Sequence, residues 1–360
     1  MIIANGIGVP FSTGGGSAPV NPDFVFEVDT TLAGSASDTF VLPLQSSGVY
    51  NFDVDWGDTN KDTITVYNQS EVTHVYSSGG TYTITITGQI EGWRFNSAGD
   101  DDKITDISNW GSLVITSDRA FTGCSALDIT ATDAPTITAT SLGYMFQSCS
   151  LLTTPDFSAW DTSGVTSMYG MFWSASAFNG DVSTWDVSSV TSLGYMFFLA
   201  ADFNNDISGW DTSSNLNMQN MFKQAYDFNQ DISGWDTSKV TSAAQSFSQC
   251  FNFNQPIGAW DVTSVTTFFK ALENCDDFDQ SLAGWDISGA AVLTSLMVSS
   301  TGISTANYDA TLIAWDAQGS MAFSGTVNFG GSKYTSGGAA EAARTSLISK
   351  WGGIIDGGAA

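Results

Sequence analysis

Aspartates recur at fixed places along much of this 360-residue chain. One series directly follows a tryptophan every 25 residues: Asp161, Asp186, Asp211, Asp236, Asp261 and Asp286. A second series shares this spacing: Asp181, Asp206 and Asp231. Carboxylates bind Ca²⁺, which makes the second series the calcium candidates, and paired carboxylates can cleave glycosidic bonds. Because turn residues follow these aspartates, we instead predict that the carboxylates accept hydrogen bonds from backbone N–H groups of the turns. We predict no cofactor, and bound Ca²⁺ is the weaker alternative.

The other reactive side chains are few. The four cysteines form two pairs with a separation of 25 residues: Cys124 with Cys149, and Cys250 with Cys275. Intervening repeats have alanine at this place, which indicates small buried core positions and reduced thiols, although neighbouring repeats are close enough for a disulfide. The single histidine, His74, has no evident nucleophile or metal partner. We therefore predict a protein that is not an enzyme, with a glycan-cleaving enzyme as a remote alternative.

The elements that must position these groups follow the same period. The tryptophans that precede the first aspartate series are Trp160, Trp185, Trp210, Trp235, Trp260 and Trp285. Two phenylalanine columns accompany them: Phe178, Phe203, Phe228, Phe253 and Phe278, and Phe172, Phe197, Phe222 and Phe247. Self-similarity at this period marks a solenoid whose repeats bury their apolar faces against each other. We expect a mainly β fold with short helices, in which residues 96–300 form a right-handed solenoid with both aromatic columns in its core.

A further aromatic column has the composition of a surface. Trp173 and Phe198 follow the core phenylalanine at a place where later repeats carry Lys223 and Ser248. A column that accepts lysine is exposed, so its aromatic members are candidate receptor-binding residues. The candidate set is completed by three tyrosines of the same repeats: Tyr144, Tyr169 and Tyr195.

Residues 23–95 follow a different pattern. Alternating, β-branched runs separated by turn residues predict a β-sandwich. The segments Val54-Asp55-Trp56-Gly57-Asp58 and Thr73-His74-Val75-Tyr76 resemble the polycystic-kidney-disease-type domain, an immunoglobulin-like module of surface proteins. Thr59 departs from the glycine that ends the turn of that family. The resemblance implies a structural role for His74.

The repeats also resemble known families. The segment Ala120-Phe121-Thr122-Gly123-Cys124-Ser125-Ala126-Leu127 is similar to BspA-like leucine-rich repeats, and later repeats such as 221–241 resemble those of Mycoplasma-type surface lipoproteins. The segment from Tyr308 to Trp315 resembles the end of such arrays, so residues 301–360 are expected to cap the solenoid. These resemblances imply a leucine-rich-repeat-type solenoid that serves adhesion and binds protein or glycan, with no shared chemistry.

Charge and hydropathy exclude two classes of partner. The formal net charge is -27, with ten Lys and Arg against 37 Asp and Glu. Phosphate backbones and anionic membranes both need basic contacts, so we predict no nucleic-acid partner. No run approaches the roughly 20 apolar residues of a membrane span.

The first residues suggest where the protein acts. The start from Met1 shows no basic segment, long apolar run or cleavage motif of an export signal. We therefore predict a virion surface component, such as a phage fibre, receptor-binding or capsid-decorating protein, that presents the solenoid to a host protein or glycan. Residues 1–22 form a flexible or anchoring arm toward other virion proteins through the apolar residues Ile2, Ile3, Val9 and Phe11. The protein could also form a homo-oligomer. The alternative to a virion protein is a bacterial cell-surface adhesin whose export signal this sequence lacks.

Overall fold

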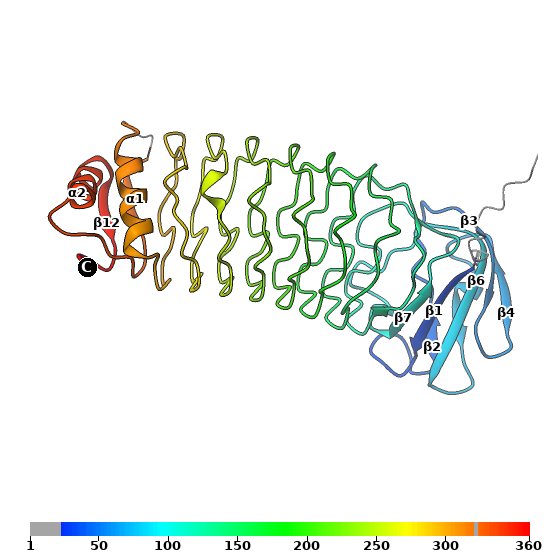
Figure 1. The fold of residues 1–360 in the computed structure, drawn as a ribbon. Coiled ribbons are helices and arrows are strands. Elements are labelled where there is room, and N and C mark those ends of the chain that lie inside the picture. The colour runs from blue at the N-terminus through cyan, green and yellow to red at the C-terminus, as the bar shows by residue number, and fades with distance from the viewer. Residues whose placement is uncertain (1–22, 320–322) are drawn as a thin grey trace, which may run out of the picture.

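The computed structural model describes residues 23–319 and 323–360. It is elongated, with a β-rich domain at the N-terminal end, a row of coils and a helical C-terminal end (Figure 1). The fold is mainly β with two α-helices and open sheets, as the sequence predicts. The four predicted virion-anchoring residues lie outside the described residues: Ile2, Ile3, Val9 and Phe11.

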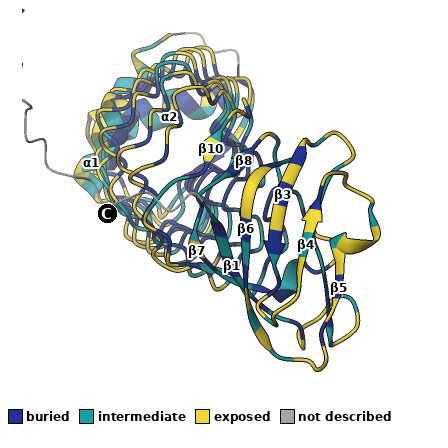
Figure 2. Ribbon diagram, turned by 90° about the vertical axis from the view of Figure 1, so that its right-hand side faces the viewer, coloured by how far each residue is buried: buried dark blue, intermediate teal, exposed yellow. Residues whose placement is uncertain are grey.

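The N-terminal domain has two antiparallel sheets. The strands of the larger sheet within this domain are β1 (Phe24–Asp29), β3 (Tyr50–Asp55), β4 (Lys61–Ile64) and β6 (Thr81–Glu91). The smaller sheet pairs β2 (Thr39–Val41) with β5 (Thr73–Val75), which follows the 3₁₀ turn η1 (Ser70–Val72). Buried and less buried residues alternate along β1 and β3, which is plain for β3 in Figure 2. This period of two places one face of each strand in the core.

The larger sheet continues into the first coils. β7 (Ile104–Asn109) follows the 3₁₀ turn η2 (Asp101–Lys103) and pairs with β1 and, in parallel, with β9 (Asp128–Ile129). β8 (Leu113–Ile115) pairs in parallel with β6 and with β10 (Thr136–Ile137). Strands on both sides of the predicted boundary at residue 95 therefore share one sheet.

A buried lysine strengthens this junction. Lys103 is fully buried, and its Nζ donates hydrogen bonds to the carbonyls of Ser35, Ala36 and Thr39. The Asp100 carboxylate lies 3.7 Å from Nζ and accepts hydrogen bonds from the backbone of Ser35 and Val41. A buried charge requires such partners, so the loop before β2 is fastened to the start of the coils.

Residues 140–300, called the coil stack below, form coils that lie side by side between the N-terminal domain and α1 (Figure 1). Parallel bridges join equivalent residues of successive coils: Ser141, Ser167, Ser192, Asn217, Ser242, Thr267 and Val292. Each repeat thus contributes a single bridge residue in place of a strand, and most other residues form turns. A 3₁₀ turn, η3 (Ile257–Ala259), is the one helical element of the coil stack.

Both aromatic columns lie in the core, as predicted. The six repeat tryptophans are 2–6% exposed. Rings of one phenylalanine column stack at centroid distances of 5.6–5.7 Å: Phe146, Phe172, Phe197, Phe222 and Phe247. From Trp185 to Trp285 each indole Nε1 also donates to a carbonyl 28 residues earlier, at 2.8–3.2 Å. Each ring thus buries apolar surface and satisfies its only polar group.

Polar side chains connect the coils in what we call the amide ladder: Asn179, Asn204, Asn229, Asn254 and Asp279. Each Oδ1 accepts a hydrogen bond from the backbone N–H of the next member, at 2.9–3.0 Å. Glutamines reinforce it, because Nε2 of Gln255 donates to Oδ1 of Asn229 at 2.8 Å. The ladder ends where Asp279 accepts the N–H of Ser304, beside the start of α1. It fixes the register of neighbouring coils.

The C-terminal segment covers the last coil. It contains α1 (Thr305–Asp316), α2 (Ala339–Trp351) and the parallel pair β11 (Gly325–Asn328) and β12 (Gly352–Ile355). Trp315 on α1 donates from Nε1 to the carbonyl of Leu282 at 3.0 Å, so the tryptophan series ends on a helix. Among the described residues, no helix is long and apolar enough to cross a membrane.

Candidate functional site

The aspartates after the tryptophans are held in turns. Asp186 Oδ1 accepts hydrogen bonds from the backbone N–H of Ser188 at 2.9 Å and from its hydroxyl at 2.6 Å. Asp261 accepts the same two bonds from Thr263. The hydroxyl and backbone hydrogen bonds hold the pKa of both carboxyls below the ordinary value. The prediction that turn backbone satisfies these aspartates is confirmed.

The calcium candidates have the same arrangement. Asp181, Asp206 and Asp231 each accept the backbone N–H of the serine two residues later at 2.9 Å. Across residues 23–319 and 323–360, no group of three or more His, Cys, Asp or Glu side chains is placed to hold a metal ion. The structure therefore does not assemble these residues into a coordination sphere.

The cysteines are free and fully buried, as predicted. The thiol of Cys149 lies 3.2 Å from the carbonyl oxygen of Phe121, and that of Cys275 lies 2.9 Å from the carbonyl oxygen of Phe247. Burial raises the pKa of all four thiols, which keeps them protonated and poor nucleophiles.

His74 is a packed residue of the N-terminal domain. Its Nε2 lies 2.9 Å from Oδ2 of Asp58, and its ring stacks on Trp56 at 4.7 Å. Tyr76 meets the ring edge-on at 4.5 Å. Burial raises the pKa of Asp58, but hydrogen bonds from His74 and Asn60 outweigh burial and lower it overall. These contacts tie β5 to the turn after β3, consistent with the structural role expected of His74.

The five candidate receptor-binding residues do come together. We call them the aromatic strip: Tyr144, Tyr169, Trp173, Tyr195 and Phe198. Neighbouring rings lie 5.2–6.1 Å apart, with Trp173 5.2 Å from both Tyr195 and Phe198. All five side chains are half-buried and lie outside the core cluster. They are less exposed than the column composition predicts, because each ring packs against its neighbours.

A cation lies at each end of the aromatic strip. The guanidinium of Arg119 lies 4.4 Å from the ring centroid of Tyr144, and Nζ of Lys223 lies 5.6 Å from that of Phe198. Arg94 and Arg119 share the carboxylate of Asp118. Lys223 was predicted only to mark its column as exposed. Because Lys223 belongs to the same column as Trp173 and Phe198, the sequence could have indicated that it lies beside them.

The sequence segments that contain the aromatic strip have no acidic residue. Residues 138–150, 163–176, 188–201 and 213–226 contain no Asp or Glu, although the chain has 37. Asp202 and Asp227 directly follow two of these segments. Asp118, and Asp101 whose side chain approaches Gly123, belong to the region before the first tyrosine.

Two tyrosines of the strip adopt backbone conformations that L-residues avoid. Tyr144 has φ 57° and Tyr195 has φ 60°, at a place in the coil where other repeats carry Gly170, Asn220 or Lys270, also with positive φ. A non-glycine residue there costs about 1 kcal/mol or more. The backbone N–H of Tyr195 donates to the carbonyl of Gln219 in the next coil at 2.9 Å, which holds this conformation. The sequence pattern did not reveal it.

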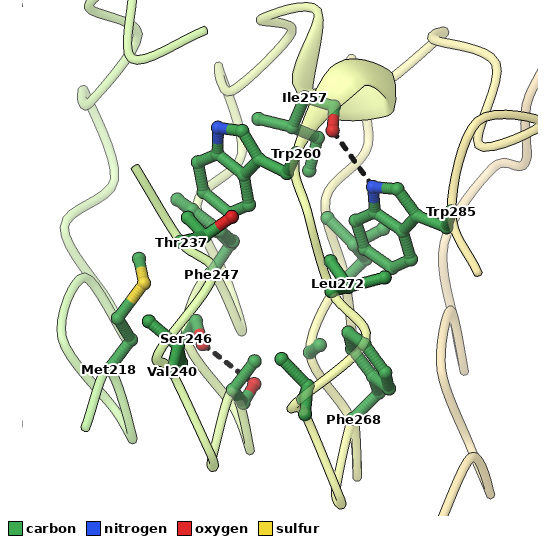
Figure 3. A pocket seen from close by; sticks show the side chains of 14 residues that line it. Met218, Thr237, Val240, Ser246, Phe247, Ile257, Trp260, Phe268, Leu272 and Trp285 are labelled. Atoms are coloured by element: carbon green, nitrogen blue, oxygen red, sulfur yellow. Dashed lines mark hydrogen bonds between the residues drawn. The ribbon is translucent and has the colours of Figure 1, made fainter. Parts of the chain in front are cut away.

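A small cavity in the coil stack is too small for a ligand. It has a volume of about 10 Å³, no more than one water molecule needs, and an apolar lining (Figure 3). Ala243 and Ser246 border it at places where neighbouring coils carry Met218 and Met221. The cavity is therefore a packing defect left by two short side chains.

Comparison with known proteins gives one match. Residues 140–250 and 208–311 match a family described as "Mycoplasma protein of unknown function, DUF285". No curated protein and no solved structure matches the chain. The coil stack is therefore similar to the repeats of this Mycoplasma family, which confirms that part of the predicted resemblance and leaves the immunoglobulin-like domain as a prediction.

Proposed function

We propose that this protein is a non-enzymatic, surface-exposed adhesion protein. In this proposal a polycystic-kidney-disease-type domain carries a right-handed, leucine-rich-repeat-type solenoid whose aromatic strip contacts a host protein or glycan. The observation that carries the proposal is the strip itself, with five half-buried aromatic side chains that remain outside the core in segments without Asp or Glu. Aromatic clusters that remain accessible at a surface are typical of binding sites.

The proposed site of action is the surface of a virion. The described chain enters the molecule at Asp23, in the domain opposite the helical cap, so a partner bound to residues 1–22 would hold the protein by that end (Figure 1). The coil stack would then extend away from the particle. The high negative charge would oppose adhesion to released nucleic acid.

Mass spectrometry of purified particles and of cell envelopes from the same culture tests this location. The proposal expects the protein in particles, and expects a variant without residues 1–22 to be missing from them. Truncated protein in particles at normal copy number would show that the arm is not the anchor. Protein found in envelopes alone would refute the virion assignment and favour a bacterial adhesin.

We further propose that function requires no metal. The calcium candidates already accept hydrogen bonds from turn backbone. Chelation with EDTA should therefore change the melting temperature by much less than about 10 °C, since a larger shift would need several kcal/mol of metal binding. A shift above that size, reversed by added Ca²⁺, would contradict the proposal.

A further inference from the structure

We infer that the aromatic strip binds an acidic oligosaccharide, whose sugar rings lie on the aromatic faces and whose acid groups pair with Lys223 and Arg119. The inference rests on the proposed function as a surface-binding protein, whether a particle or a cell carries it. Three observations carry it: the size of the strip, its polar groups and its charge.

The size of the strip favours a glycan over a protein partner. Large aromatic side chains have roughly 150–250 Å² of surface, and these five are mostly covered by their neighbours. The strip therefore presents only a few hundred Å², well below the roughly 800 Å² that each partner contributes to a standard protein interface. A row of rings at spacings of 5.2–6.1 Å instead suits successive sugars of one chain.

The strip also offers hydroxyl groups beside its rings. Tyr144, Tyr169 and Tyr195 lie in a row, with ring centroids 5.4 and 5.2 Å apart. Burial, together with the two neighbouring tyrosines, raises the pKa of Tyr169 to about 12, so its hydroxyl remains a donor at neutral pH. An amphipathic surface with apolar faces and adjacent hydrogen-bonding groups matches the two sides of a sugar ring.

The charged residues beside the strip favour an acidic sugar as its ligand. The chain has ten Lys and Arg in all, yet Arg119 and Lys223 lie at the two ends of the strip. Arg119 is partly neutralised by Asp118, whereas Lys223 forms no ion pair with any described residue. Because the four segments that hold the strip and Lys223 contain no Asp or Glu, an anionic ligand meets less like charge there than elsewhere on this acidic chain.

The repeats themselves supply matched variants. Ser248 occupies the place of Trp173, Gln147 that of Lys223, and Ser176 that of Phe251, so Trp173→Ser, Lys223→Gln and Phe251→Ser all introduce residues that the coil accepts. Phe251 is the control, because it is 39% exposed and stacks on Tyr226, outside the strip.

Isothermal titration calorimetry of the full-length protein tests the inference with heparin, hyaluronan and oligosialic acid hexasaccharides, and with cellohexaose as the neutral probe. At least one acidic probe should bind more tightly than cellohexaose. Trp173→Ser should weaken binding about tenfold, as loss of a central aromatic anchor does, and Phe251→Ser should leave it within about twofold. Lys223→Gln should remove most of the preference for the acidic probe.

Other results would overturn the inference. The inference would be wrong if no acidic probe binds, or if cellohexaose binds as tightly as the acidic probes. It would also be wrong if Trp173→Ser and Phe251→Ser reduce the affinity for the acidic probe equally. A wild-type dimer that Trp173→Ser converts to a monomer in light scattering would assign the strip to a second copy of the chain. If the calorimetry finds no acidic glycan, the proposed location of the protein still stands or falls with mass spectrometry. If the protein is absent from particles, the glycan inference still stands or falls with calorimetry.

Discussion

Replacement of Asn229 by alanine should destabilise the coil stack by removing one rung of the amide ladder. Oδ1 of Asn229 accepts the N–H of Asn254 at 2.9 Å and Nε2 of Gln255 at 2.8 Å. Gln255 keeps its second bond, to the Asn229 carbonyl at 2.7 Å, whereas the N–H of Asn254 loses its partner. At roughly 1 kcal/mol for each neutral hydrogen bond lost, the free energy of unfolding should fall by about 2 kcal/mol.

Asn229→Asp is the matched control. A carboxylate keeps both acceptor interactions, and Asp279 occupies the equivalent place at the end of the ladder. Burial raises the pKa of Asp279, but hydrogen bonds from Ser304 and Asn307 lower it overall. Equivalent hydrogen bonds would lower the pKa of an aspartate introduced at position 229. Its ionised carboxylate would then stabilise the folded state at any pH above the unfolded-state pKa, and this stabilisation would be lost as the pH falls through the lower, folded-state pKa.

Urea unfolding monitored by indole fluorescence measures these changes, because the six repeat tryptophans are buried in the coils. At pH 7, Asn229→Ala should unfold at lower urea and Asn229→Asp should stay within about 1 kcal/mol of the wild type. The stability advantage of Asn229→Asp over Asn229→Ala should shrink as the pH is lowered from 7 through the folded-state pKa of the introduced carboxyl. If Asn229→Ala matches the wild type, or Asn229→Asp is equally destabilised at pH 7, the ladder does not fix the coils as argued.

Three further predictions concern the coil backbone, its packing defect and its thiols. Ser174 has φ 60°, so Ser174→Gly should raise the free energy of unfolding by about 0.5–1 kcal/mol, whereas Ser176→Gly, without positive φ, should lower it. Ala243→Cys, which adds a single sulfur atom, should fill the cavity and stabilise the protein by up to about 1 kcal/mol in urea unfolding. Ala225→Met, at a filled core position, should instead cost roughly 1–3 kcal/mol. Ellman's reagent should find no reactive thiol in the native protein and four after denaturation without reductant, and two or none would show disulfides.

The sequence predicted those features that a repeated residue type determines directly. Large apolar side chains such as Trp210 must be buried, and the lysine at position 223 indicated that its column lies outside the core, although the column is half-buried rather than exposed. For the same reason the gathering of Trp173 and Phe198 followed from their register, since equivalent residues of stacked coils are neighbours.

Other features depend on contacts that residue types do not encode. The left-handed backbone at Tyr195 is held by a hydrogen bond to the next coil, and tyrosine by itself predicts a different conformation. The cavity beside Ala243 depends on how Phe268 of the following coil packs, which no single repeat reveals. The strand of residues 104–109 joins the N-terminal sheet through pairing with β1, across the boundary that composition suggested.

A crystal structure of the full-length protein with the tightest-binding acidic hexasaccharide tests the central claim most directly. We expect a sugar ring stacked on Trp173 and an acid group within hydrogen-bonding distance of Lys223 Nζ. A hexasaccharide bound elsewhere, or an aromatic strip covered by a second copy of the chain, would contradict it.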